Sequence, residues 1–298
     1  MNLEARKQPS RARIRRLGCA LAALGLITLP PVPAGGGEPP QPAPKPHRIV
    51  SICVQGDQLA LQLLPRERIA ALSQFAADPD ISAHANLAQG IPTTQSSAEA
   101  LARLKPDLVL ITAHATQFTA AALRQIGVRV LELGIPNDFD ELRAQIRQAG
   151  CAFGEPERAE TLIRSMDARL ERLEARRPPP AQRPTALFYF QDGFTPGGHT
   201  FANALLEAAG FRNLGARFSA GVGASAPLEA VIMTHPQLLI LTRYRETSPT
   251  QTQVNATQPL FRRLGAGCRI LSVSFRHVAS PDPSNLEFAE MLQNSLSR

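Results

Sequence analysis

The chain has 298 residues, of which 44% are apolar, 5% aromatic and 19% charged, and its formal net charge is +7. Residues 1–34 carry +5 of that charge, so residues 35–298 carry only +2. A nucleic-acid-binding domain needs a clustered basic face in its folded part, and we therefore expect no nucleic-acid partner. After the leader and a linker, about 250 residues remain, enough for two packed cores.

The first 34 residues have the pattern of a secretory signal peptide. A basic start that ends at Arg16 precedes the apolar run Leu17–Leu29, and small residues follow at Val32-Pro-Ala34. This apolar run is too short to cross a membrane as a helix. We predict a cleavable signal peptide over residues 1–34 and export to the periplasm, with the cleavage site and the export route left open. Residues 35–46 are rich in Pro and Gly and are predicted to form a flexible tether.

One sequence pattern occurs twice. Glu99–Thr112 and Glu229–Thr242 have Glu, Ala, Pro, Leu and Thr at matching positions, and each Pro precedes an apolar run. The pattern predicts a short helix, a Pro that ends it and a buried strand. Two distant copies indicate two similar lobes rather than a repeat array, which needs several copies at a short period. Helix–Pro–strand units are common in α/β proteins, so coincidence is the alternative.

The similarity extends to the segments on either side of this pattern. Helices that end at a Gly are predicted over Leu123–Gly127 and Phe261–Gly265. Each is followed by a predicted strand, Arg129–Leu133 after the first helix and Arg269–Val273 after the second. Opening strands are predicted at Arg48–Cys53 and Ala186–Phe190. Strands that alternate with helices favour parallel sheets covered on both faces. The predicted fold class is α/β, with two Rossmann-like lobes that contain parallel sheets.

A long helix is predicted between the two lobes. Residues 157–177 have apolar residues at helical spacing, Pro156 suits the first turn, and Pro178-Pro-Pro180 prevents continuation. A helix of about 20 residues is roughly 30 Å long. We predict that this single long helix joins the lobes, with an N-terminal lobe at 47–152, the connecting segment at 153–180 and a C-terminal lobe at 181–298.

Cysteines and catalytic motifs give weaker signals. Cys53, Cys151 and Cys268 remain after the leader, at spacings unlike those of zinc ribbons or redox pairs. One disulfide is conceivable in an oxidising compartment, but three buried thiols are the simpler interpretation. The sequence lacks Gly-x-Ser-x-Gly, His-Glu-x-x-His and phosphate-loop motifs. We therefore expect no enzyme, no cofactor and no metal site.

The motifs, taken in order, resemble a known family. They are Val50-Ser51-Ile52-Cys53 with Gly56-Asp57-Gln58-Leu59, the stretch from Glu99 through Leu-Lys-Pro-Asp-Leu-Val, Leu123–Gly127, the long helix, Gly197-Gly198-His199-Thr200, Ala209–Asn213 and Leu228-Glu229. Over residues 47–296 the chain resembles the class III periplasmic substrate-binding proteins of ABC importers, which carry ferric siderophores, haem and cobalamin. The resemblance implies a monomer that binds a small-molecule metal chelate and delivers it to the transmembrane subunits of an ABC permease.

The resemblance also implies a role for two acidic residues. In such proteins a Glu on each lobe docks onto Arg residues of the permease, and Glu99 and Glu229 occupy the matching positions, each seven residues before its Pro. The alternative is that each is a first-turn acid that favours the helix start and needs no partner.

The ligand cleft is predicted at the carboxyl ends of the strands, where open α/β sheets bind ligands. The residues expected there are Gln55, Gly56, Asp57, Phe75, His114, Tyr189, Gly198, His199, Tyr244, Arg245, Phe275 and Arg276. Arg245 and Arg276 suit an anionic ligand, whereas His114, His199 and His277 do not form the ligand pattern of zinc or manganese binders. Residues 274–284 depart from the aromatic, Gly- and Pro-rich stretch usual in the family, so the role of this loop and the identity of the ligand stay open.

The sequence therefore favours a periplasmic solute-binding component of an ABC importer for an iron–siderophore or cobalamin-type chelate. The alternatives are a carrier of haem, a free metal or an oxyanion, and a secreted sensor or enzyme on the same scaffold.

Overall fold

The computed structural model describes residues 45–112, 117–190, 193–244 and 267–297. The chain divides into two compact units, residues 1–43 and 44–298. The first unit, with the predicted signal peptide and most of the tether, lies outside the described residues, so the second unit is described below. None of its described helices is both long and apolar enough to span a membrane.

The first lobe contains a five-stranded parallel sheet in the order β3-β2-β1-β4-β5. Its strands are β1 (Ile49–Ser51), β2 (Ile69–Ser73), β3 (Thr93–Thr94), β4 (Leu108–Thr112) and β5 (Arg129–Leu133). Its helices are α1 (Val54–Leu63), α2 (Ala85–Ala88), α3 (Ala98–Arg103), α4 (Gln117–Gln125) and α5 (Phe139–Phe153). Strand β1 lies in the middle of the sheet, with β2 and β3 on one side and β4 and β5 on the other, as in doubly wound sheets.

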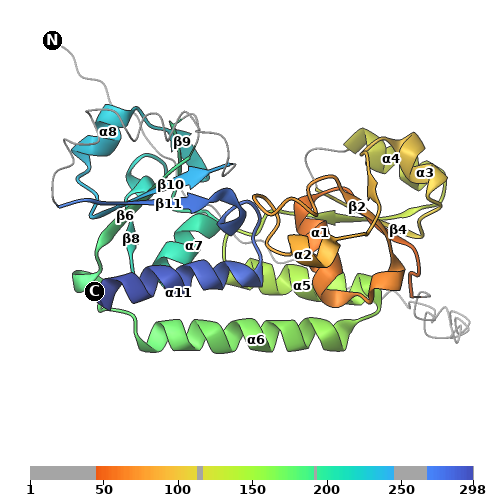
Figure 1. Cartoon of the computed structure of the whole chain (residues 1–298), viewed down its shortest axis with the longest axis horizontal. Coiled ribbons are helices and arrows are strands. Elements are labelled where there is room, and N and C mark those ends of the chain that lie inside the picture. Colours follow the sequence, from red (N-terminus) through yellow and green to blue (C-terminus); the bar gives the residue numbers. More distant parts are fainter. Residues whose placement is uncertain (1–44, 113–116, 191–192, 245–266, 298) are drawn as a thin grey trace, which may run out of the picture. The chain divides into compact units, whose positions relative to one another are not determined.

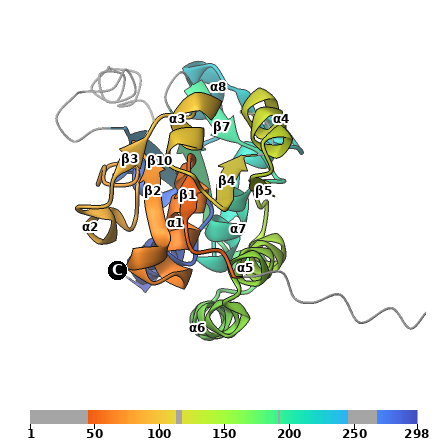
Figure 2. The same cartoon turned by 90° about the vertical axis from the view of Figure 1, so that its right-hand side faces the viewer.

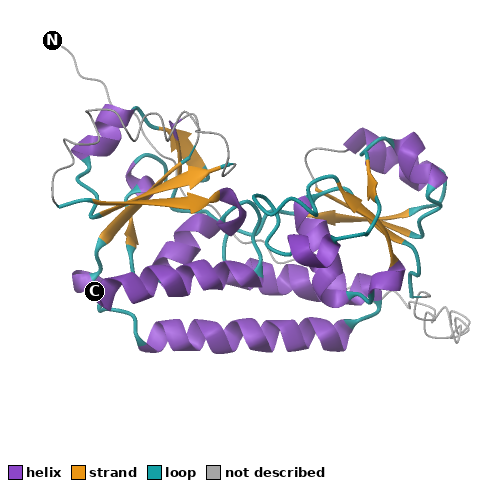
Figure 3. Ribbon diagram, viewed as in Figure 1, coloured by secondary structure: helices purple, strands orange, loops and turns teal. Residues whose placement is uncertain are grey.

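The second lobe contains a four-stranded parallel sheet in the order β11-β10-β6-β8. Its strands are β6 (Thr185–Tyr189), β8 (Arg212–Asn213), β10 (Leu238–Arg243) and β11 (Arg269–Ser274). A small antiparallel pair adds β7 (Phe194–Pro196) and β9 (Gly223–Ser225). Its helices are α7 (Phe201–Ala208), α8 (Leu228–Met233) and α11 (Leu286–Asn294). Figures 1 and 3 show the two sheets as separate groups of strands, with helices around each.

The predicted repeat is present in the backbone. Helices α3 and α8 have six residues each, and β4 and β10 follow them after a Pro. Lys105 and His235, the residues before the two prolines, both have φ +47°, and no other described residue except glycine has a positive φ. A left-handed residue just after a helix is a common way to end it. Strand β5 has the predicted bounds, whereas the predicted helix over 261–265 lies outside the described residues.

The predicted long helix is α6, Pro156–Ala175, with a Pro in its first turn. It follows α5 and precedes β6 in the chain. Gly150 lets α5 approach it closely, because a Cβ there would lie 2.4 Å from the Cβ of Ala159. On the second-lobe side, Arg169 forms an ion pair with Glu290 of α11 at 2.9 Å. Figure 2, with α6 seen nearly end-on, shows it beside α5. Helix α6 therefore contacts helices from both lobes.

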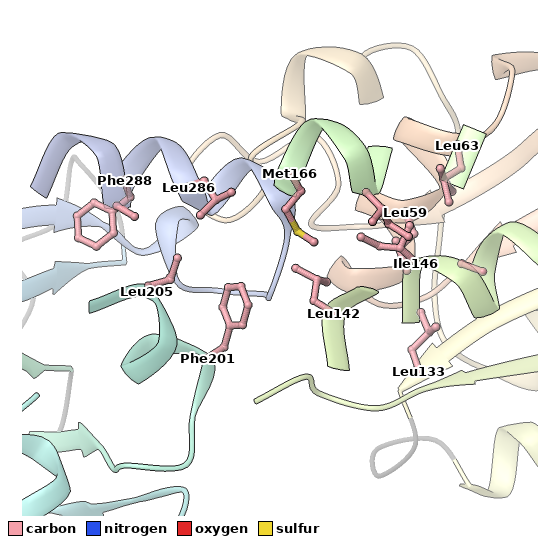
Figure 4. Packing of buried hydrophobic residues seen from close by; sticks show 14 of the residues in the cluster. Leu59, Leu63, Leu133, Leu142, Ile146, Met166, Phe201, Leu205, Leu286 and Phe288 are labelled. Atoms are coloured by element: carbon pink, nitrogen blue, oxygen red, sulfur yellow. The ribbon is translucent and has the colours of Figure 1, made fainter. Parts of the chain in front are cut away.

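The hydrophobic core differs from the prediction of two packed cores. The largest cluster of buried side chains runs through both lobes and α6, and two smaller clusters lie elsewhere, one in each lobe. Figure 4 shows Met166 of α6 between Leu142 of the first lobe and Leu286 of the second. The rings of Phe139 and Phe201 meet edge to face at 5.0 Å between α5 and α7. The lobes are therefore joined by packing as well as by the chain.

The cysteines also differ from the prediction of three buried thiols. Cys53, Cys151 and Cys268 are all free, and Cys151 is exposed on α5 because its position lies on the outer face of that helix. Burial raises the pKa of Cys53 to about 12, so this thiol stays protonated at neutral pH.

We predict that Met166→Ala lowers the free energy of unfolding by about 2–5 kcal/mol, because it leaves a cavity in the shared core. Met166 is 1% exposed. Both tyrosines lie in the second lobe and the chain has no Trp, so tyrosine emission reports on that lobe while far-UV circular dichroism reports on both. The two urea transitions should coincide before and after the substitution.

The matched control is Ser165→Ala, an exposed neighbour on the same helix, which should change stability by less than about 0.5 kcal/mol. Separate midpoints for the two probes would contradict a shared core.

Candidate functional site

The carboxyl ends of the first-lobe strands border a polar hollow of about 400 Å³. Its lining residues are Ile52, Ser73, Gln74, Phe75, Thr94, Gln95, Ser96 and Ser97. Hydroxyl and amide groups dominate this set, and Phe75 is its one aromatic residue, with 39% of its surface exposed. The hollow can therefore offer hydrogen bonds and one ring face to a bound molecule.

Asp57 supports this hollow from within the lobe. It is fully buried, its Oδ1 accepts from the Ser73 backbone N–H at 3.0 Å, and its Oδ2 accepts from Ser73 Oγ at 2.5 Å. Ser73 Oγ in turn accepts from the backbone N–H of Phe75 at 3.2 Å. Burial raises the pKa of Asp57 more than the Ser73 hydrogen bonds lower it. Asp57 therefore positions the turn that carries Phe75.

Three residues that were expected to line the cleft in the first lobe are instead buried. The first is Asp57. The second is Gln55, which is hydrogen-bonded to Gln145 of α5. The third is Gly56, where an added Cβ would lie 2.6 Å from Ser51 Oγ. The prediction that they contact a ligand is corrected, because α1 packs directly on the sheet and turns these positions inward. Of the first-lobe set, Phe75 lines the hollow, and His114 lies outside the described residues.

The second lobe gathers four aromatic rings at the corresponding strand ends. Tyr244 and Phe275 lie 5.4 Å apart, Phe275 and Phe190 6.2 Å, and Phe190 and Phe194 6.1 Å, measured between ring centroids. Tyr244 is 36% exposed, and the other three are partly buried. We call Phe190, Phe194, Tyr244 and Phe275 the aromatic group. Such a group can hold a large organic ligand by stacking and apolar contact.

Tyr189 does not belong to this group, which corrects its assignment to the cleft. It is 5% exposed and packs in the smaller core cluster of the second lobe with Leu187 and Val231. Burial, with a smaller effect from the charge of Glu229, raises its pKa. Because successive strand residues face opposite sides, the next residue, Phe190, takes the place expected for Tyr189. Phe190 and Phe194 were missed, although this alternation could have indicated Phe190.

The other predicted residues of the second lobe are dispersed. Arg276 is exposed beside Phe275. Gly198 lines a different pocket with Asn213 and Arg217, and the backbone N–H of exposed His199 donates to Gly221 at 3.1 Å. Arg245 lies outside the described residues. In the described part of the chain, no three His, Cys, Asp or Glu residues are grouped to hold a metal ion.

A larger hollow of about 660 Å³ lies away from the strand ends, between α5, α6 and α7. Its lining includes Asp138, Phe139, Glu171 and Glu207. Ligands of open α/β sheets bind at the carboxyl ends of the strands, so we place the candidate site at the polar hollow and the aromatic group instead.

Comparison with known proteins decides the family. Residues 58–267 match the family model described as periplasmic binding protein. This chain belongs to the periplasmic binding protein family. That family is one of solute-binding proteins rather than enzymes.

Several proteins are similar to this periplasmic binding protein. A cobalamin-binding protein of Halobacterium salinarum is 23% identical over 256 residues, which cover 84% of this chain and 69% of that protein. The uncharacterized ABC transporter substrate-binding lipoprotein YvrC of Bacillus subtilis is 27% identical over 154 residues, 48% of each chain. A possible iron-binding, periplasmic solute-binding protein from Staphylococcus epidermidis has a similar fold, with a TM-score of 0.70, 20% identity and coverage of 86% of this chain and 100% of that chain.

In this periplasmic binding protein, the divergent loop at 274–284 contacts the first lobe. Asp282 is 1% exposed and accepts a hydrogen bond from Gln62 Nε2 of α1 at 2.6 Å, and His84 Nε2 lies 3.2 Å from its other oxygen. Ser274 Oγ also donates to the carbonyl of Asp80 at 3.4 Å. We call Gln62, His84 and Asp282 the interlobe junction. The loop at 274–284 therefore ties the second lobe to the first.

The interlobe junction contains two titratable groups with opposite pKa shifts. Burial lowers the pKa of His84, but the hydrogen bond and charge of Asp282 outweigh it and, with the charge of Glu287, place the pKa above the ordinary 6.5. Burial raises the pKa of Asp282, but the hydrogen bond and charge of His84 and the bonds from Ser284 bring it below the ordinary 3.8. The His84 contribution to stability is complete below pH 6.5 and is lost as pH rises through its raised pKa, whereas the Asp282 contribution is lost as pH falls through its lowered pKa.

We predict that the protein is more stable near pH 5.5 than near pH 8, and that His84→Gln removes this difference. Urea unfolding at the two pH values measures it. The control is His47→Gln, because His47 is exposed and its backbone N–H, which the substitution keeps, donates to Asp107. An unchanged pH dependence in the His84 variant would show that the junction does not contribute.

Proposed function

We propose that this protein is the periplasmic solute-binding component of an ABC importer, which binds a metal chelate of the iron–siderophore or cobalamin type. The family assignment, the cobalamin-binding relative and the ABC-transporter relative support this proposal. The predicted signal peptide supports a periplasmic location.

The proposed ligand class rests on the different chemistry of the strand ends in the two lobes. The first lobe offers hydroxyl and amide groups with Phe75, and the second offers the aromatic group beside Arg276. A metal chelate is a large molecule with apolar and planar parts and with polar groups around its edge. Stacking on the aromatic group and hydrogen bonds in the polar hollow suit such a molecule better than a small spherical ion.

A thermal-shift panel tests the ligand class, with cyanocobalamin, a ferric hydroxamate, a ferric catecholate, haemin and molybdate. A ligand at 100 times its Kd stabilises the folded state by about 2.7 kcal/mol, so a bound chelate raises the midpoint clearly. We expect stabilisation by cyanocobalamin or by a ferric siderophore. Stabilisation by haemin or molybdate alone, or by none of the five, would contradict the proposed ligand class.

We predict that Phe275→Ala weakens binding of the chelate found in this panel by about tenfold, because it removes the ring that contacts both Tyr244 and Phe190. Isothermal titration calorimetry measures the change. Met291→Ala is the control, since Met291 is 44% exposed on α11. If the Phe275 variant and the unsubstituted protein bind the chelate with equal affinity, the aromatic group is not part of the ligand site.

The charge of the ligand decides the expected effect of Arg276→Ala. For an anionic chelate we predict a loss of about 1.5–3 kcal/mol, because a charge-assisted hydrogen bond is removed. For a neutral chelate we expect no change. An anionic chelate that binds the variant with full affinity would show that Arg276 faces solvent in the complex.

We also propose that Glu99 and Glu229 dock onto the permease. Each is the second residue of its helix, and both are exposed. We predict that Glu99→Ala combined with Glu229→Ala abolishes cellular uptake of the labelled chelate while its affinity for the purified protein stays nearly unchanged.

The matched control for docking is Glu67→Ala combined with Glu171→Ala, which removes two other exposed carboxylates. Normal uptake by the Glu99 and Glu229 double variant would exclude docking through these residues without affecting the ligand proposal.

A further inference from the structure

The two short helices with the docking residues have the same backbone. Helix α3 and helix α8 each have Glu at the second position and a buried residue at the fourth, Leu101 or Val231. Their exposed and buried positions follow the same order from Ala98 to Pro106 and from Leu228 to Pro236. A partner that meets both lobes therefore meets two helices that expose equivalent positions.

The two surfaces differ in charge at two exposed positions: Arg103 and Lys105 in the first lobe correspond to Met233 and His235 in the second. In α3, Arg103 Nη2 lies 2.6 Å from Glu99 Oε1, and the two side chains are 78% and 77% exposed. The equivalent residue in α8 is Met233, which is 72% exposed, and α8 has no basic residue. Within the described residues, Glu229 forms no ion pair. The carboxylate is therefore balanced by a cation on α3 and left unbalanced on α8.

We propose that the two lobes dock unequally, with Glu229 and Met233 of α8 as the dominant contact to a cationic, periplasm-facing surface of the permease. This inference rests on the proposed function and adds a difference between its two docking residues. Charge complementarity supports it, because Glu229 presents a full negative charge to an approaching Arg or Lys. Glu99 must first exchange Arg103 for the partner's cation, so its net gain on docking is smaller.

Met233 adds an apolar contact beside the charged one. An exposed Met is a flexible apolar side chain that adapts to a partner surface. A carboxylate next to a Met can pair with the head of an Arg while the Met packs against the aliphatic stem of the same side chain. Arg103 cannot do this in α3, because it repels an approaching cation.

The experiment exchanges Arg103 and Met233, the residues four positions after the two Glu residues. A permease–ATPase complex of the same organism, chosen because it imports the chelate found in the thermal-shift panel, is purified, placed in nanodiscs and immobilised. The mature protein is the analyte in biolayer interferometry without added ligand. We expect Glu229→Gln to raise Kd by about tenfold and Glu99→Gln by less than about threefold. Met233→Arg should weaken binding and Arg103→Met should strengthen it or leave it unchanged.

Controls separate charge from folding and shape. Met233→Leu and Arg103→Lys keep the charge at each position and should bind nearly as the unsubstituted protein does. Equal thermal midpoints verify that all variants fold, since the four side chains are exposed.

The outcomes separate this inference from the proposed function. Equal losses for Glu99→Gln and Glu229→Gln, or tighter binding by Met233→Arg, would overturn unequal docking while docking itself stands. The docking role in the proposed function would be contradicted if the unsubstituted protein did not bind the complex. It would also be contradicted if neither Glu99→Gln nor Glu229→Gln changed the Kd.

Discussion

The shared hydrophobic core is the constraint on which the rest of the structure depends. Side chains from α5 in the first lobe, from α6, and from α7 and α11 in the second lobe belong to one buried cluster. Tilting one lobe against the other disturbs this packing, and packed interiors resist deformation because small gaps lose many contacts. The interlobe junction adds a buried, charge-assisted contact between the lobes. The two strand edges that form the candidate site are therefore held on a common base, and we expect only small relative movement on binding.

This constraint has a functional consequence. Binding proteins whose lobes are connected by a few loop residues can close widely, because those residues absorb the rotation. Here a 20-residue helix, α6, lies between the two lobes in the chain and contacts α5 of the first and α11 of the second. A ligand gains affinity from a site that is already formed, since less ordering accompanies binding. Under the proposed function, the permease has little closure by which to distinguish the loaded protein from the free one, so we infer that the proposed docking residues and the bound ligand itself contribute to recognition.

The sequence predicted the elements better than the site. The repeated pattern placed α3, β4, α8 and β10 correctly, because a Pro that ends a helix and an apolar strand are local signals. The shared core was not foreseen, since the apolar positions of α6 do not reveal that they contact both lobes. The predicted cleft residues were chosen by their place after a strand. Phe75, Tyr244 and Phe275, chosen in this way, have rings at the strand ends that are exposed or partly exposed, and their contact with a ligand stays a prediction. The criterion does not give side-chain direction. Asp57 and Tyr189 therefore proved to be buried, and Phe190 was overlooked.

The distance between the lobes in solution tests the shared core and its functional consequence most directly. Spin labels at Gln125→Cys on α4 and Met233→Cys on α8, in a variant with Cys151 and Cys268 replaced by Ser, allow pulsed electron–electron dipolar measurement of that distance. Both label sites are exposed, and a sample without the two label cysteines shows whether the partly buried Cys53 takes up label. We expect one narrow distance distribution in the free protein, whose mean moves by less than its width when cyanocobalamin or a ferric siderophore saturates the site. A broad or two-peaked distribution, or a shift larger than that width, would contradict the account.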